Sequence, residues 1–333
     1  MDSVQDIIPA RLTMHTGLSP VSPLHAVMVE WAGRIGDRTE GRVAIVVSSG
    51  SPTGYEPVGS RSVDSLPPGA PMPFLEAGSF DIRASNPALV PNNFPIAKTL
   101  PCFFQGVSVI SARKVWNRLW DEFAEIRQEF DGRTVLFGHG VAGCVVGATR
   151  GPLHGLRDLA GLTLAPMVGF GGLLSRLGAV ETPLVIDIFP ELRDKRVDGA
   201  MFPAELLQSF AYGALVRHVL HLPLVCPPAG DYFYMDVDKW NTLPQAVQGV
   251  FEEERKWIET ELDNVLTVSE QATFDWARSE GIEIARLPVE DLDEFRRIWG
   301  ESATDAANEL DRQGFPGSTI FERTRQLCAS TGT

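Results

Sequence analysis

The sequence predicts an α/β protein, because short β-branched segments alternate with amphipathic helical segments along most of the chain. A helical pattern from Pro244 to about Ser279 is a second observation. At 1.5 Å per residue it would be about 50 Å long, more than one small domain spans. The length of 333 residues is the third, since it is typical of about two domains. We therefore expect two α/β domains braced by one long helix.

The N-terminal elements predict a βαβ unit. Arg11–Thr16 has the composition of a strand, Ser22–Asp37 has apolar residues at helical spacing, and Arg42–Val47 is a second β-branched run. A strand, a helix and a strand in this order favour parallel strands. Residues 49–73 are rich in Gly, Pro and Ser and predict a long loop.

The same alternation continues to the C-terminus. A helix is expected over Ala112–Glu129, followed by a strand over Thr134–Phe137 that Gly138 ends. His218 and His221 are expected near a helix end, and without a nearby Cys or carboxylate they predict no metal site. The remaining elements are strands at Leu162–Ala165, Thr182–Ile186 and Asp198–Phe202, and helices at 169–178, 188–195 and Ala303–Gln313.

Charge and hydropathy exclude several classes of protein. Lys and Arg number 29 against 43 Asp and Glu, so the net charge is −14 and no basic stripe is available for a nucleic-acid partner. No run of about 18 apolar residues predicts a membrane span. The acidic start, Met1–Asp6, is unlike a signal peptide. Either the protein is cytosolic, or Met1 replaces the leader of a mature exported form.

The cysteines are widely spaced, which indicates neither a disulfide scaffold nor a zinc cluster. One or two disulfides are possible, and four buried thiols are favoured. The four positions are Cys102, Cys144, Cys226 and Cys328.

Gly138–Gly143 matches the dinucleotide pattern G-x-G-x-x-G after an expected strand. A helix would have to begin on that loop, but the β-branched run from Cys144 and the Gly and Pro that follow oppose one. A tight turn between strands is favoured, and a cytosolic NAD-dependent oxidoreductase using Gly138–Gly143 remains the alternative. The motifs of serine hydrolases, zinc proteases and P-loop proteins are absent. No catalytic residue, cofactor or metal is therefore predicted, and the protein is not expected to be an enzyme.

Seven segments in order resemble the solute-binding proteins of tripartite ATP-independent periplasmic (TRAP) transporters, of the dicarboxylate-binding (DctP-like) type. They cover most of the chain. The segments are Ser22-Pro-Leu-His25 with Thr39-Glu-Gly-Arg42-Val43, Glu76-Ala-Gly-Ser-Phe-Asp81-Ile82, Phe94-Pro-Ile96 with Leu100-Pro-Cys-Phe103, Leu156-Arg-Asp-Leu-Ala-Gly161-Leu162, Leu173-Leu-Ser-Arg-Leu-Gly178, Arg196-Val-Asp198-Gly-Ala200 and Asp238-Lys-Trp240-Asn-Thr-Leu-Pro244.

The resemblance implies a two-lobed periplasmic-binding-protein-like fold, with mixed sheets flanked by helices and a long helix spanning both lobes. Lobe I would be 1–136 with the return segment 222–262. Lobe II would be 137–221 with 263–333, and the ligand cleft would lie between them. Such a protein is periplasmic, closes over a small organic solute by a shift in population, and delivers it to the transporter's membrane subunits.

One departure from the family pattern concerns the ligand. The strand after the Asp158–Leu162 segment usually carries an Arg that clamps the carboxylate of the solute, and Ala165 stands there. The polar residue expected after Asp198-Gly-Ala200 is also replaced, by Met201-Phe-Pro203. The upstream basic or aromatic position falls in the small-residue tract Val141–Cys144. A carboxylate buried without its cation would cost several kcal/mol.

Two hypotheses follow. Another cation, Arg83 or, behind it, Arg150, takes over the clamp. Alternatively, the solute is neutral, aromatic or cationic, contacts aromatic rings, and has Glu205 or Asp231 as a counter-charge. His15, at the end of the first strand, is a further candidate, with packing inside the fold as the equal alternative. The predicted ligand-binding residues are His15, Arg83, Asn86, Ala165, Phe170, Phe202, Glu205 and Tyr232.

Overall fold

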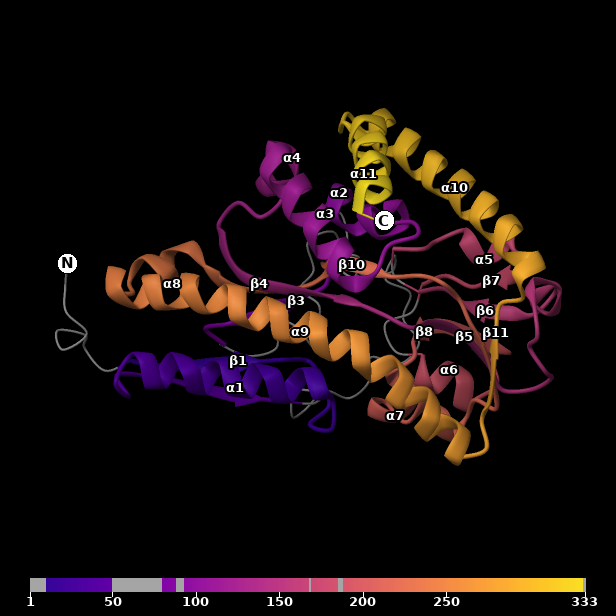
Figure 1. Ribbon diagram of the computed structural model, residues 1–333, viewed down its shortest axis with the longest axis horizontal. Coiled ribbons are helices and arrows are strands. Elements are labelled where there is room, and N and C mark those ends of the chain that lie inside the picture. Colours follow the sequence, from indigo (N-terminus) through magenta and orange to yellow (C-terminus); the bar gives the residue numbers. More distant parts are fainter. Residues whose placement is uncertain (1–9, 50–79, 88–92, 168, 185–187, 332–333) are drawn as a thin grey trace.

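The structure, a computed structural model, describes residues 10–49, 80–87, 93–167, 169–184 and 188–331. Its strands form two groups, joined by a long helix that runs across the molecule (Figure 1). Most of the loop predicted over 49–73 and part of the strand predicted over Thr182–Ile186 lie outside these residues. The predicted α/β class is confirmed.

The first group of strands contains the predicted βαβ unit. β1 (Ala10–His15) and β2 (Val43–Ser48) are parallel and are connected by α1 (Pro23–Arg38), as the sequence predicts. A bridge from Met14 to Ile82 links this pair to a three-stranded antiparallel sheet. That sheet has the order β3 (Arg83–Ser85), β10 (Cys226–Asp236) and β4 (Arg133–Val141).

The second group is one mixed sheet of six strands. Successive residues of its strands enter different cores, since Val145 packs on one face and Val146 on the other. The order is β11 (Glu283–Arg286), β9 (His218–His221), β5 (Cys144–Ala148), β8 (Gly199–Pro203), β6 (Thr163–Ala165) and β7 (Val180–Glu181).

The long helix α9 (Gln245–Ser279) connects the two groups. Val247 and Ile258 pack with α1 and the first sheets, whereas Phe274 and Ala277 pack under the six-stranded sheet. Its bounds agree with the helix predicted over Pro244–Ser279. The helix runs from α8 (Val237–Asn241) at one end of the molecule towards α7 (Leu206–Ser209) at the other (Figure 1).

The remaining helices pack against a third core, between the three-stranded sheet and the six-stranded sheet. Phe103, Trp116, Phe295 and Ile320 are among its buried side chains. These helices are α2 (Pro95–Thr99), α3 (Val109–Glu122), α4 (Ala124–Gln128), α10 (Val289–Arg312) and α11 (Gly317–Thr331), with the 3-10 helix η4 (Leu100–Phe103). Short elements on the six-stranded sheet are α5 (Leu173–Arg176), α6 (Phe189–Arg193), η5 (Leu156–Leu159) and η6 (Tyr212–Ala214).

Several local predictions are wrong. His218 and His221 lie on β9 rather than near a helix end, and pairing with β5 and β11 explains the strand. β4 continues through Gly138 to Val141, because the segment keeps its pairing with β10. The helix predicted over Ala112–Glu129 begins three residues earlier, at Val109, and is divided at Phe123, whose backbone is extended.

The last two differences concern helix length. The helix predicted over 169–178 is reduced to α5, four residues long, after Gly172 in a left-handed conformation (φ 79°). The helix predicted over Ala303–Gln313 is the end of the 24-residue α10. No helix among the described residues is long and apolar enough to cross a membrane.

Candidate solute-binding site

A cavity of about 270 Å³ lies between the two groups of strands. Asn86, His139 and Asp231 line it from the three-stranded sheet, and Phe202 and Glu205 line it from the six-stranded sheet and the turn that follows β8. Pockets for small molecules are commonly mostly apolar, with few polar groups, and this cavity has that composition. Its polar groups are therefore the ones that can orient a ligand.

Three polar residues form a row across neighbouring strands. Asp231 on β10 is the register partner of His139 on β4, and Tyr232 pairs with Ser85, which places Asn86 beside Asp231. Residues directly opposed on antiparallel strands present their side chains to the same face. The Asn86 side chain is hydrogen-bonded to the Asp231 carboxyl. The row thus gives one cavity wall an amide, a carboxyl and an imidazole.

Glycines bring β4 close to β10. A Cβ on Gly140 would lie 2.3 Å from the carbonyl oxygen of Cys226, and one on Gly138 would lie 2.8 Å from that of Pro228. Both glycines flank His139, so no other residue would allow the two backbones to approach in this way. The His139 Nδ1 lies 2.9 Å from the carbonyl oxygen of Gly140, which fixes the orientation of the ring.

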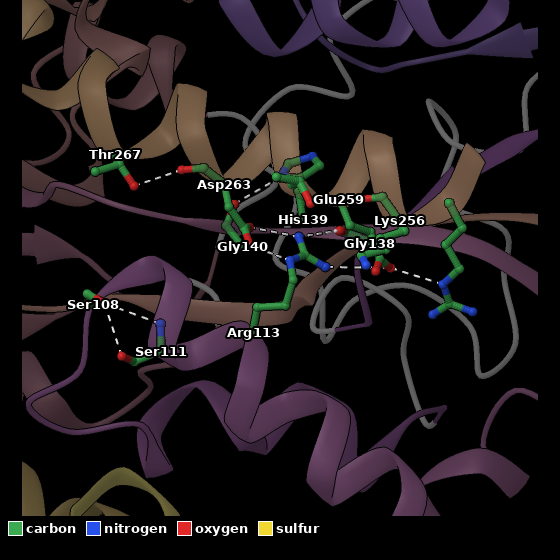
Figure 2. A network of polar contacts seen from close by, with 12 residues as sticks. Ser108, Ser111, Arg113, Gly138, His139, Gly140, Lys256, Glu259, Asp263 and Thr267 are labelled. Atoms are coloured by element: carbon green, nitrogen blue, oxygen red, sulfur yellow. Dashed lines mark hydrogen bonds and ion pairs between the residues drawn. The ribbon is translucent and has the colours of Figure 1, made fainter. Parts of the chain in front are cut away.

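A buried ion pair supports this strand from behind. Nη2 of Arg113 on α3 donates to Oδ1 of Asp263 on α9 at 2.8 Å and to the carbonyl oxygen of Gly138 at 3.0 Å (Figure 2). Nη1 of Arg113 also lies 3.5 Å from Glu259. The guanidinium therefore joins α3, α9 and β4 next to His139.

Glu205 and Asp231, two of the carboxyls that line the cavity, are half-buried. Burial raises the pKa of the Glu205 carboxyl, His139 acts in the opposite direction, and Asp231 adds to the rise. Burial likewise raises the pKa of Asp231, against the effects of His139 and the Asn86 hydrogen bond. Both carboxyls would therefore gain from a partner that favours the ionised form.

Of the predicted ligand-binding residues, the cavity brings together Asn86, Phe202 and Glu205. Phe202 packs edge-on against Tyr212 with centroids 5.1 Å apart, and its ring occupies the space where Gly147 has no Cβ. Glu205 precedes α7. Phe202 and Glu205 come from one segment, and Asn86 meets them only through the fold.

The other predicted residues lie elsewhere. Tyr232 points away from Asp231, into the core with Trp116 and Phe130. Phe170 packs against Trp299. Ala165 is fully buried at the end of β6, next to Pro166 and Met167, which do line the cavity.

The candidate cations and His15 have other partners. Arg83 forms an ion pair with Asp236 and lies over the Tyr234 ring, 5.3 Å from its centroid. Arg150 pairs with Asp198 at the surface. His15 Nδ1 lies 3.1 Å from the Ser48 hydroxyl, and its ring stacks on Phe80.

Sequence reasoning missed His139. It stands inside the segment Gly138–Gly143, which the sequence presents as a nucleotide-binding pattern or a turn. Only its first four residues belong to β4, β5 begins at Cys144, and no helix opens on the loop. The helix that a dinucleotide fingerprint requires is thus missing here, and the oxidoreductase alternative has no support. The signal for His139 was a polar side chain between two glycines on a strand.

Two groups of strands on either side of a largely apolar cavity are the arrangement of extracellular solute-binding proteins. The family model described as bacterial extracellular solute-binding protein, family 7 (DctP) matches residues 14–309. The chain belongs to this family. The resemblance seen in the sequence is thereby confirmed.

Solved structures show the same two-lobed fold. A marine metagenome TRAP solute-binding protein, in complex with 3-hydroxybenzoate, has a TM-score of 0.80 at 16% identity, with 98% of this chain and 100% of that chain covered. A TRAP solute-binding protein from Rhodoferax ferrireducens with benzoate has 0.80 at 18%, covering 97% and 98%. One from Bordetella bronchiseptica with mandelate has 0.75 at 18%, covering 97% and 99%.

Proposed function

We propose that the protein captures a small organic solute in this cavity, in the periplasm, and delivers it to the membrane subunits of a TRAP transporter. It binds without chemical conversion. The observation that carries the proposal is the cavity itself, whose walls come from two separate groups of strands. Structures of the same fold hold 3-hydroxybenzoate, benzoate and mandelate, solutes of a size that suits a cavity of about 270 Å³.

Closure requires that the two groups of strands move relative to each other. The chain passes between them at Ala142–Gly143, again between β9 and β10, and a third time along α9. Gly143 has a φ of 64°, in the left-handed region that favours glycine. These three passages are our candidates for the hinge, and a solute that contacts both walls would favour the closed form. The lobes would then be 1–136 with 222–262, and 137–221 with 263–333, except that α10 contacts elements of both and α11 packs against α3 and η4.

A thermal-shift screen against aromatic and aliphatic acids, amines and sugars tests the capture of a solute. A ligand at about a hundred times its Kd stabilises the folded protein by about 2.7 kcal/mol. Small-angle scattering should then show a smaller radius of gyration with the ligand that binds. If no compound shifts the melting temperature, the proposal fails.

A pair of variants tests whether the solute binds in this cavity. Ala142 is half-buried and lines the cavity, so Ala142→Trp places a large ring in it. Ala124 is exposed on α4, so Ala124→Trp is the matched control. We expect the ligand-induced shift to disappear in the first variant and to persist in the second. Equal shifts in both would place the solute elsewhere.

A further inference from the structure

The charged groups at the cavity do not balance. Two basic side chains close to it face a carboxyl of their own, whereas Lys98, which lines it, has no ion pair among the described residues. Arg113 is paired with Asp263. His221 Nε2 lies 3.5 Å from Glu270. Among the described lining residues, the carboxyls of Glu205, Asp231 and Glu270 then outnumber the basic side chains, which are Lys98 and His139. His139 acts on both Glu205 and Asp231.

The Glu205 carboxyl has fewer side-chain interactions than the Asp231 carboxyl. Within the described residues, no hydrogen bond or ion pair holds its side chain, although burial raises its pKa. Asp231 has the hydrogen bond with Asn86 and the neighbouring imidazole of His139. A buried carboxylate is costly unless it is paired. Among the described residues, neither Glu205 nor Asp231 forms an ion pair, so the ionised form of each lacks a cation of its own.

Aromatic side chains also line the cavity. Phe202, Phe210 and Tyr212 line the cavity near Glu205, and no described lining residue is an arginine. Aromatic rings attract a cation over their faces and also pack against a hydrocarbon body. The cavity thus combines a negative pole, formed by Glu205 and Asp231, with an apolar wall.

We propose that the solute carries a protonated amino group on a small apolar or aromatic body, and that Glu205 and Asp231 bind the amino group. The inference rests on the proposed function and names its ligand class. Ala165 is consistent with this ligand class. An arginine at this position would place a positive charge next to the cavity, and that charge would repel a cationic solute. A carboxylate solute would instead meet two carboxyls, which repel it in their ionised forms.

Matched ligands test the class. The full chain is assayed by thermal shift and calorimetry with benzylamine against benzoate, and with 2-phenylethylamine against phenylacetate. The members of each pair have closely similar bodies and opposite charge. We expect both amines to bind and both carboxylates to fail at the same concentration. If the carboxylates bind and the amines do not, the inference falls while the proposed function stands.

Two variants test the pole. Glu205→Gln and Asp231→Asn keep the shape of each side chain and remove its charge, and Glu253→Gln removes an exposed charge on α9 as the control. We expect each cavity variant to weaken amine binding about tenfold or more, with Glu253→Gln unchanged. Glu205→Gln should fold, because the half-buried side chain forms no hydrogen bond or ion pair among the described residues. Unchanged affinity in both cavity variants, or no binding of any amine to the unmodified protein, overturns the inference.

Discussion

Asp231 on β10 and His139 on β4 are directly opposed partners in the antiparallel register. The carboxyl and the imidazole therefore belong to one row on the sheet, and Asn86 extends this row on the other side of Asp231. The position of the row depends on how β4 is held, and Arg113 holds it through the carbonyl oxygen of Gly138. Residues outside the cavity thus determine its geometry.

Removal of the Arg113 side chain should strongly destabilise the protein. Arg113→Ala leaves Asp263 buried without its partner, and breaking a buried pair costs about 3–5 kcal/mol. Urea unfolding measures the loss. The double variant Arg113→Met, Asp263→Leu should recover most of it, since no charge is then buried alone. A loss below about 1 kcal/mol in the single variant would show that water reaches Asp263.

Alanine variants of Phe202 and Phe170 distinguish a loss of solute binding from a loss of core packing. Both side chains are buried, at 1% and 2% exposure, and each change to Ala should cost about 3–5 kcal/mol of unfolding free energy. Only Phe202 lines the cavity. The ligand-induced thermal shift should therefore fall in Phe202→Ala and persist in Phe170→Ala. A loss of binding in both variants would mean that general destabilisation is the cause.

The sequence predicts the fold best where an apolar periodicity continues over many residues. The apolar spacing between Val247 and Ala277 identifies α9, because a helix of this length leaves little freedom of interpretation. The four residues His218–His221 do not specify a strand by themselves, and pairing with β5 and β11 decides the outcome. The last helix, α11, was missed, since it depends on packing against α3 and η4.

The site was less predictable, because its residues meet only in three dimensions. Asn86, Phe202 and Glu205 could be selected by chemistry and by their place in the family pattern. Tyr232 is one residue from Asp231, yet strand alternation turns it into the opposite core. A single sequence does not reveal which residues pair across neighbouring strands. It could therefore not show whether Asp231 or Tyr232 faces the cavity.

Glu129 should make stability depend on pH near neutrality. Its carboxyl accepts hydrogen bonds from the backbone N–H groups of Ile96 and Ala97, at 2.6 and 2.9 Å. Burial nevertheless raises its pKa from 4.5 to about 7. The folded state then binds the proton more tightly than the unfolded state, so this contribution is present below about pH 4.5 and is lost as the pH rises through about 7.

Glu129→Gln tests that contribution. Unfolding free energies measured by urea denaturation between about pH 5 and 8 should decline less steeply with pH in the variant than in the unmodified protein. An identical slope in the two proteins would show that the carboxyl is already ionised throughout this range.

The cysteines should be unreactive in the folded protein. All four are buried as free thiols, and burial raises the pKa of Cys102 to about 12 and that of Cys328 to about 11. Since the thiolate is the reactive form, a thiol reagent should label the protein only after unfolding, and then at all four positions. Two missing thiols after unfolding would indicate a disulfide, for which Cys144 and Cys226 are adjacent.

The proton balance of binding tests the central claim most directly. A cationic solute favours the ionised forms of Glu205 and Asp231, whose pKa values burial raises, so binding should release protons. Titration calorimetry of 2-phenylethylamine in buffers of different ionisation enthalpy measures the number and sign of the protons exchanged. We predict a net release that increases as the pH is lowered and that is smaller in Glu205→Gln. Proton uptake on binding would contradict an acidic pole that receives a cation.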